Sequence, residues 1–515
     1  MTATKLSAVR QSLAQIRTQW MSASVAILVM AVCSTAVAMC LGFFPVTALI
    51  LAVLLCYVIA CKVFSARFVT LAAIVAGTAF LLRRFDIRFG VTCLDTEFRL
   101  SFFIVLAGCL ALLARAIMRR TLRIGSDMLL PFVALIIASL LSITAGSVSG
   151  TGRATPAGQL GEMAKFLVPV VFCFAIAWGG LSREDIRRLL RIIVMTAVAT
   201  ALMVVVVSIF SDWFVKTFGW KHVWYGNESI ARAHVPLSGG IQSGAFLVMV
   251  FPLCLQMYYG SSKRRDILFF FFSAIVIALG IVFCFSRAIL VTAVLTTCGM
   301  FLARTERKGK LSRGSRKWIF ALLLVAAVTA VVSAVSFERY IARGRRSQSI
   351  EYRRKGAEVA LTVIRDHPVI GSSFATVYPR QVTGFVPDAH RGGRMAVIFY
   401  KGEVSPVDPH NLFLMIAAEM GLFGLAVFSW LIYRIFRNLN NYASSARPSP
   451  AEKLIVNGFM WGIFAFLFQS LGASFLMTDL RIAVLFWTFV GVSLAFVNGT
   501  SDFFQEADAA VGTER

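Results

Sequence analysis

Long apolar runs dominate this chain and decide what it can fold into. Most of them approach the roughly 20 residues that a helix needs to cross a membrane. Only helices and closed barrels satisfy their backbone groups in lipid, and these runs lack the short alternating pattern of barrel strands. The composition agrees, since 58% of the residues are apolar and 15% are charged. The sequence therefore predicts an all-α polytopic membrane protein with about 12–14 transmembrane helices.

About fourteen apolar segments can be placed along the chain. They lie near 22–44, 45–64, 67–82, 101–117, 127–147, 162–180, 189–210, 241–259, 266–285, 287–303, 317–336, 411–436, 454–477 and 481–498. From them we expect N-terminal transmembrane helices over 1–210, an external loop over 211–240, transmembrane helices over 241–336, a large periplasmic loop with short helices over 337–410, C-terminal transmembrane helices over 411–500 and a cytoplasmic tail over 501–515.

Clusters of arginine and lysine predict which helix ends face the cytoplasm, where basic residues concentrate. These clusters follow every second apolar segment, at 119–123, 183–191, 263–265 and 304–317. The parity places both termini inside and the two long loops outside. The loop over 337–410 is also basic, with twelve Lys and Arg against seven Asp and Glu, which long loops permit. Its charge suits either anionic lipid headgroups or an anionic substrate that arrives from outside.

All five histidines fall in the two long loops, at 222, 234, 367, 390 and 410. His410 stands out because Asp408 and Pro409 before it suit a helix start. A stripe at helical spacing then ends in Gly421 and Gly424, and such a stripe lets another helix approach closely. A rigid helix would hold the imidazole at the membrane surface, as a general base requires. Histidine is also a common capping or interfacial residue, so both interpretations stay open.

Two arginines could bind an anion at the outer face. Ser286 can cap a helix that begins at Arg287, in a tight hairpin between two apolar segments. A helix N-terminus with a guanidinium favours anions, although a snorkelling arginine would have the same sequence. Arg232 precedes the stretch Ser238-Gly239-Gly240, whose backbone could form a phosphate nest ahead of the next helix.

The large loop holds a predicted amphipathic helix over 351–366. The segment His367-Pro368-Val369-Ile370-Gly371 would end it. Arg353 and Arg354 lie at its start, where they either reach a substrate or are simply solvated. One face of this helix would carry Ala357, Ala360, Leu361 and Ile364.

These motifs resemble one family. His410-Asn411, nine residues, Gly421, two residues and Gly424 are similar to the His-[Asn/Ser/Gln]-x9-Gly-x2-Gly signature of the O-antigen ligase and polymerase family. The amphipathic helix that ends in His367-Pro368-x-x-Gly371 resembles the start of that family's large periplasmic loop. Arg287 resembles its Arg-x3-Leu element, and Arg232 its external arginine. The resemblance covers about residues 225–500.

The chain departs from the family pattern at two places. The residue four after Arg287 is Val291 where the family has leucine. The expected Gly-x-Gly after His-Pro reads Gly371-Ser372-Ser373, which puts the geometry of that turn in question.

The resemblance implies a metal-independent glycosyltransferase without cofactors in the bacterial inner membrane. It would polymerise or ligate polyprenyl-diphosphate-linked glycan repeats (O-antigen, capsule or exopolysaccharide) at the periplasmic face. The acceptor would be a glycan, a lipid A core or, in some relatives, pilin, and nucleic acid is not an expected partner. By the same resemblance, His410, Arg287 and Arg232 are catalytic; Arg353, Arg354, Asn411 and Ser286 contact substrate; and Gly371, Gly421 and Gly424 are structural.

Other functions make different demands on the sequence. A peptidoglycan-type membrane glycosyltransferase should depend on an external acid such as Asp408. A flippase or transporter of lipid-linked oligosaccharides should show internal repeats and a basic central cavity, and no repeat is visible. The absence of P-loop, GxSxG and HExxH motifs argues against an ATP-driven pump, a serine hydrolase and a zinc protease.

Overall fold

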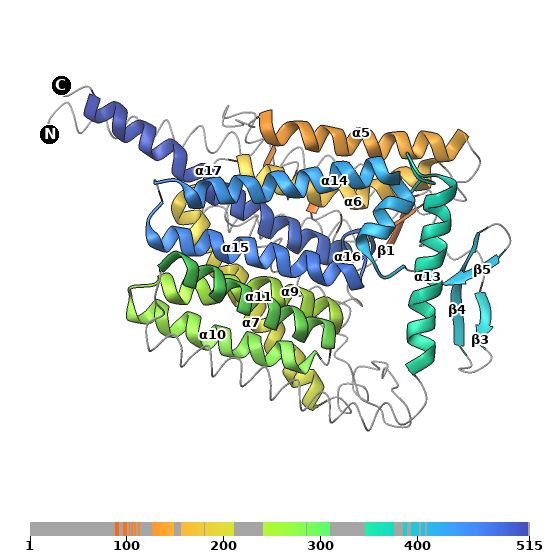
Figure 1. Cartoon of the computed structure of the whole chain (residues 1–515), viewed down its shortest axis with the longest axis horizontal. Helices are drawn as coiled ribbons and strands as arrows, with labels where there is room; N and C mark the ends of the chain where they lie inside the picture. Colours follow the sequence, from red (N-terminus) through yellow and green to blue (C-terminus); the bar gives the residue numbers. More distant parts are fainter. Residues whose placement is uncertain are drawn as a thin grey trace, which may run out of the picture.

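The computed structural model describes a bundle of long helices with small elements at one end (Figure 1). The described residues are 88–91, 96–99, scattered positions in 102–113, then 126–148, 156–210, 240–308, 346–374, 385–388, 393–400, 403–406 and 409–512, with 180, 285 and 447 excepted. The long helices are α5 (Ser126–Val148), α6 (Pro156–Trp178), α7 (Arg183–Ile209), α9 (Gly240–Gly260), α10 (Arg264–Phe283), α11 (Arg287–Lys308), α13 (Arg346–Asp366), α14 (Leu412–Ser444), α15 (Pro450–Gln469) and α17 (Leu480–Gly512).

The predicted fold class is confirmed. In the described ranges, eight helices are long and apolar enough to cross a membrane, and the apolar part of α11 is a shorter one. They match the predicted segments from 127–147 to 287–303 and from 411–436 onward. The segments at 22–44, 45–64, 67–82 and 317–336 lie outside the described residues, as does most of 101–117. The count of 12–14 therefore stays a prediction.

Successive spanning helices run in opposite directions, so their ends gather on two sides of the bundle (Figure 1). At one side, the basic end, α6, α9 and α14 finish and α7, α10 and α15 start. There Arg183 lies 3.8 Å from Glu452, and Arg191 lies 3.1 Å from Asp266. At the other side, the loop end, α5, α7, α10 and α15 finish and α6, α9, α11, α14 and α17 start. This alternation matches the parity of the basic clusters.

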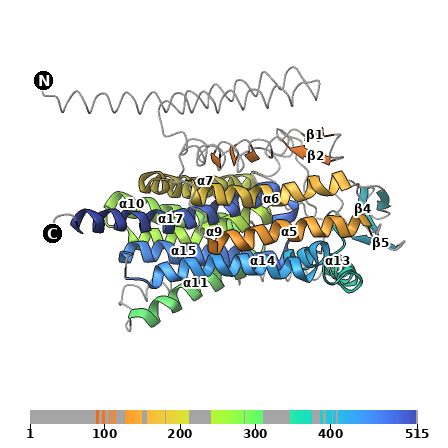
Figure 2. The same cartoon turned by 90° about the horizontal axis from the view of Figure 1, so that it is seen from above.

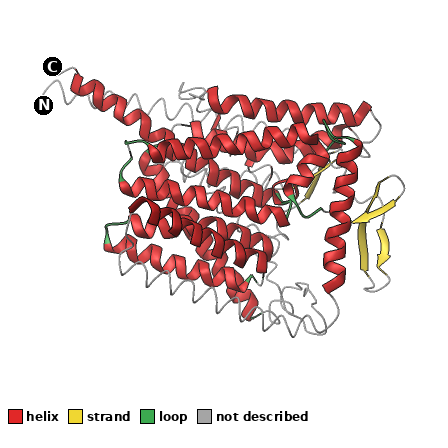
Figure 3. Ribbon diagram, viewed as in Figure 1, coloured by secondary structure: helices red, strands yellow, loops and turns green. Residues whose placement is uncertain are grey.

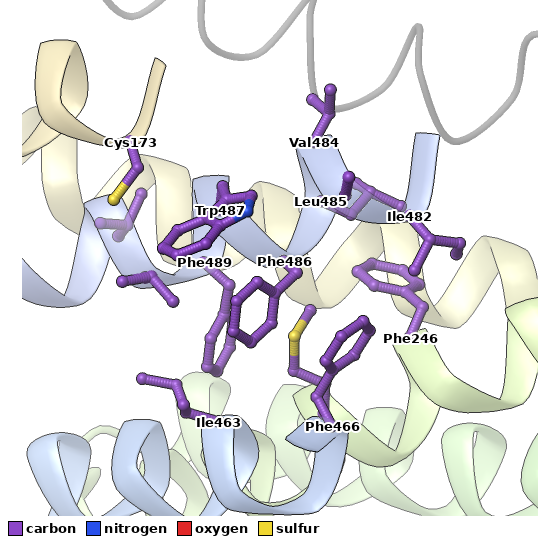
Figure 4. Packing of buried hydrophobic residues seen from close by; sticks show 14 of the residues in the cluster. Cys173, Phe246, Ile463, Phe466, Ile482, Val484, Leu485, Phe486, Trp487 and Phe489 are labelled. Atoms are coloured by element: carbon purple, nitrogen blue, oxygen red, sulfur yellow. The ribbon is translucent and has the colours of Figure 1, made fainter. Parts of the chain in front are cut away.

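Small residues and aromatic rings pack the centre of the bundle, where α15 meets α9 and α17 meets α6. Gly458 and Gly462 of α15 face α9 so closely that a Cβ on either would overlap the α9 main chain. Such residues let membrane helices approach each other. Figure 4 shows the aromatic packing, in which the rings of Phe466 and Phe486 stack with centroids 4.5 Å apart. This packing fixes the frame on which the loop end rests.

Helix α13 lies across the loop end, crosswise to the spanning helices (Figure 1). It begins at Arg346, five positions before the predicted start, and ends at Asp366 as predicted. The predicted apolar face is partly wrong, because Leu361 is 54% exposed while Ala360 and Val363 are buried. The contact is a narrow one with α14, and small side chains suit it better than leucine.

Short helices account for only part of the 337–410 loop. A three-stranded antiparallel sheet, β3 (Phe385–Asp388), β4 (Gly393–Tyr400) and β5 (Glu403–Pro406), stands beside α13 (Figure 3). The run Val397-Ile398-Phe399-Tyr400 favours a strand, and only two residues join β4 to β5, the length of a tight hairpin. A second hairpin, β1 (Arg88–Val91) with β2 (Thr96–Arg99), is antiparallel as well (Figure 2).

Candidate active site at the loop end

The start of α14 positions His410. Asn411 is the N-cap of this helix, and its side-chain oxygen accepts hydrogen bonds from the amides of Phe413 (2.9 Å) and Leu414 (3.1 Å). The helix therefore begins at Leu412, three positions after Pro409, because the left-handed φ of His410 cannot belong to a helix and Asn411 takes the cap position. The oxygen of Asn411 is engaged in the cap, so a contact between this side chain and a substrate would fall to its amino group.

His410 has an unusual backbone. Its φ is 49°, in the left-handed region, and its side chain is half-buried. This conformation costs a residue with a side chain on the order of 1–3 kcal/mol and gathers at active sites. Histidine tolerates it better than most residues. The strain supports the interpretation of His410 as a functional residue over that of a histidine that only lies at the membrane interface.

Helix α14 breaks at Gly421, whose φ of 72° and ψ of 178° lie outside the helical region. The break divides α14 into a first half (412–420) and a second half (422–444). It separates two backbone carbonyls of the first half from the amides that would otherwise bond them. Ala418 and Glu419, which carry the two carbonyls, are buried, and all four backbone groups need partners in a helix that lies in lipid.

The turn after α13 supplies all four partners. This turn, residues 367–373, lies in the break and exchanges two donors and two acceptors with it. The bonds run from the amide of Ser372 to the carbonyl of Ala418 (3.0 Å), from Ser373 to Glu419 (3.0 Å), from Leu422 to Pro368 (2.8 Å) and from Phe423 to Val369 (3.2 Å). The predicted helix stop at His367–Gly371 thus also fills the break in α14 with hydrogen-bonding backbone groups. We call the turn 367–373 the plug.

Two of the predicted structural glycines make this plug possible. Gly371 has a φ of 80°, and a Cβ on it would overlap the carbonyl of Glu419 and the amide of Gly421. A Cβ on Gly421 would overlap the carbonyl of Val369. The interpretation of Gly421 and Gly424 as a surface for another helix is therefore wrong for Gly421, which admits a turn. Gly424 faces the side chain of Met420 in its own helix.

The first half of α14 is held on its other side by α13. Ala360 and Val363 pack against Ala418 in a small apolar cluster separate from the main core. Arg353 and Arg354 lie on exposed positions of α13, and Arg354 pairs with Glu358 at 3.2 Å. This pairing agrees with solvated arginines as much as with substrate contacts.

Arg287 lies at the same end of the bundle as His410. Helices α10 and α11 form the predicted tight hairpin, and α11 starts at Arg287, with the amide of Leu290 bonded to the carbonyl of Ser286 (3.1 Å). Ser286 is buried and the Arg287 side chain is exposed. Val291 is 51% exposed, so valine in place of leucine alters no core packing.

Arg232, the Ser238-Gly239 stretch, Asp408 and the histidines at 222, 234 and 390 lie outside the described residues. The catalytic role of Arg232 therefore stays a prediction. His367 follows α13 directly and bonds the carbonyl of Val363 through its amide (2.9 Å), as expected of a residue that ends a helix.

Sequence reasoning missed Arg481, which is 1% exposed at the start of α17. Its guanidinium Nε lies 3.6 Å from the carboxylate of Asp479. The pair sits where 3-10 helix η2 (Ser470–Gly472) and the one-turn helix α16 (Phe475–Thr478) interrupt the path from α15 to α17. An arginine between two apolar segments was the available signal, as at Arg287.

Together these features define a multi-pass α-helical membrane protein with polar, strained elements gathered at one end of its bundle. Residues 272–429, from α10 to the second half of α14, match the family model described as O-antigen ligase, which confirms the resemblance. The chain is also 31% identical over 77 residues to a provisionally named polysaccharide ligase of Rickettsia prowazekii (strain Madrid E), covering 14% of this chain and 19% of that one. A provisionally named polysaccharide ligase of Rickettsia felis (strain ATCC VR-1525 / URRWXCal2) is 32% identical over 73 residues, 14% and 18% of the two chains. The chain thus spans about a fifth of the length of the curated relatives it matches.

Proposed function

We propose that this protein is a membrane glycosyltransferase that polymerises or ligates polyprenyl-diphosphate-linked glycans. The observation that carries the proposal is the strained, capped His410 at the loop end, within the stretch that matches the O-antigen ligase model. The loop end would face the periplasm and the basic end the cytoplasm, with the protein in the bacterial inner membrane and both termini inside.

The reaction would replace one bond at the anomeric carbon of the donor sugar. The acceptor hydroxyl attacks this carbon, His410 takes the hydroxyl proton, and the carbon–oxygen bond to the diphosphate breaks. The polyprenyl diphosphate leaves with the bonding electrons. Arg287 and Arg232 would stabilise the negative charge that grows on it, and Ser286 would lie beside them. Guanidinium groups suffice for this charge, so the proposal includes neither metal nor cofactor.

Arg353, Arg354 and the amino group of Asn411 would contact the glycan or the diphosphate. Donor and acceptor would meet at the membrane surface, where α13 lies across the bundle end (Figure 1). The acceptor, whether another lipid-linked glycan, a lipid A core or a pilin, decides between polymerase and ligase.

A gene deletion with complementation tests the proposal. Strains that carry His410→Ala, Arg287→Ala or Arg232→Ala should lose the surface glycan that the wild-type gene restores. Single repeats without long chains would identify a polymerase, and long chains left on the lipid carrier would identify a ligase. Normal glycan in all three strains would refute the site.

The same strains separate the rival functions. Inactive Asp408→Ala with active His410→Ala would favour a peptidoglycan-type transferase. Lipid-linked glycan that accumulates on the cytoplasmic leaflet would favour a flippase, because a transferase acts on donor that has already crossed.

A further inference from the structure

Two buried hydrogen bonds connect α6 to the turn that fills the α14 break, and α5 to the first half of α14. The hydroxyl of Ser373 donates to the side-chain oxygen of Gln159 on α6 (2.7 Å). The hydroxyl of Ser142 on α5 donates to the carbonyl of Glu419 (2.5 Å). Ser142, Gln159 and Ser373 are all buried, and α5 and α6 lie outside the stretch that matches the family model.

Ser373 is the residue where the family pattern leads one to expect a second glycine. Its φ is 89°, a left-handed conformation that glycine adopts without strain and serine does not. A serine at such a position suggests a use for its side chain. The side chain has one: its hydroxyl bonds Gln159 while its amide bonds the carbonyl of Glu419.

The packing around this pair is close on every side. A Cβ on Gly146 of α5 would overlap Ser373, and the rings of Phe166 on α6 and Phe374 lie 6.0 Å apart. The turn is therefore held by α5 and α6 on one side and by the α14 break on the other. A shift of α6 would be passed to the first half of α14.

We infer that Gln159 and Ser373 are positioning residues that set the placement of His410 through the first half of α14. The half-helix extends about 10 Å from the two carbonyls at the break to Leu412, at 1.5 Å per residue, and His410 lies two residues beyond its start. A small tilt of the half-helix therefore becomes a displacement of the imidazole. A displacement of about 1 Å can lower a rate on the order of 100-fold. This inference rests on the proposed function, because it needs His410 to be the reacting base.

The test uses the purified full-length protein in nanodiscs, with lipid-linked glycan as donor and transfer measured as kcat and KM. We expect Ser373→Gly to lower kcat by about 10- to 100-fold with the donor KM unchanged. The thermal midpoint should stay the same or rise, because glycine relieves the strained φ. A merely structural serine would predict an unchanged kcat.

Gln159→Leu should lower kcat to a similar extent, and the double variant should be no worse than either single one, since both remove the same bond. Thr200→Val is the matched control: Thr200 is buried on α7 and bonds only within its helix in the described contacts, to the carbonyl of Thr196 (2.8 Å), so its loss should leave kcat unchanged.

His410→Ala distinguishes the two ways to fail. If His410→Ala keeps full kcat, the proposed base is wrong and the inference falls with it. If His410→Ala is inactive while Ser373→Gly and Gln159→Leu keep the wild-type kcat, or change only KM, the inference alone is overturned. Additive losses in the double variant would also overturn it, because independent effects mean that no shared bond positions the histidine. Should Gln159→Leu fail to accumulate, the kcat of Ser373→Gly decides.

Discussion

The two halves of α14 share the main core but differ in the contacts they make beyond it. The second half, 422–444, buries a regular apolar stripe against the bundle, formed by Val427, Phe428, Leu431, Ile435 and Leu439. The first half, 412–420, also buries apolar residues in the main core, and in addition it has an asparagine cap, a small cluster on α13 and two backbone bonds to the 367–373 turn. The other two backbone bonds of the turn go to Leu422 and Phe423, just past the break. Apolar stripes tolerate exchange of one side chain for another of similar volume, whereas backbone bonds at a break depend on unique geometry.

This difference separates stability from placement. The second half fixes the helix in the bundle, and the first half sets where His410 lies. Substitutions in the first half should therefore lower activity more than stability, and substitutions in the second half should lower stability more than activity. The following variants test this expectation.

The largest effect should come from His410 itself. His410→Ala should lower kcat about 10²- to 10⁴-fold, the usual contribution of a general base. Stability should change little, and His410→Gly should be more stable than the wild type by about 1 kcal/mol, because glycine accepts the left-handed backbone. Transfer assays and urea or thermal unfolding in micelles measure the two quantities. A His410→Gly protein that is both active and more stable would contradict the assignment of His410 as the general base.

The next effect is on folding. Gly421→Ala should destabilise the protein by about 3–5 kcal/mol, since it combines a strained φ with overlap against the carbonyl of Val369. The folded fraction in membranes should fall visibly. Gly472→Ala is the control, because a Cβ there meets nothing within 4 Å. An equal folded fraction for Gly421→Ala and Gly472→Ala would mean that the 367–373 turn does not pack against Gly421 as described.

The helices of the bundle could be predicted from the sequence because each apolar run in lipid must satisfy its backbone hydrogen bonds internally, and a helix does this. The hairpin at Ser286-Arg287 and the helix stop at His367–Gly371 were predictable from local capping and proline rules. The plug was not, because it depends on bonds between residues about 50 positions apart along the chain, such as Ser372 with Ala418. Leu361 was assigned to the wrong face because apolar spacing alone does not say how narrow a contact is. Gln159 was missed because its partner, Ser373, lies 214 positions away along the chain and no local pattern connects the two. Arg481 was missed although its place between two apolar segments was a usable signal.

A smaller effect should follow loss of the helix cap. Asn411→Ala should cost about 1 kcal/mol, since two first-turn amides lose their partner. The fall in kcat of Asn411→Ala should be larger than this loss of stability alone would cause, because the Asn411 cap fixes the position of His410 directly before it. Asn411→Asp, which keeps a cap acceptor, should restore most of the stability. Equal stability of Asn411→Ala and the wild type would show that the cap contributes nothing.

The smallest effect should come from the second half. Ile435→Val removes one buried methylene, and core changes of this kind cost about 0.5–1.5 kcal/mol. The loss is thus close to that of Asn411→Ala, but kcat should stay at the wild-type value, because Ile435 lies 14 residues past the break, about 21 Å along the helix at 1.5 Å per residue. Both variants are measured for unfolding and for transfer in one preparation. If Ile435→Val lowered kcat as much as Asn411→Ala at equal stability loss, α14 would act as one rigid rod, and the break at Gly421 would not separate placement from stability.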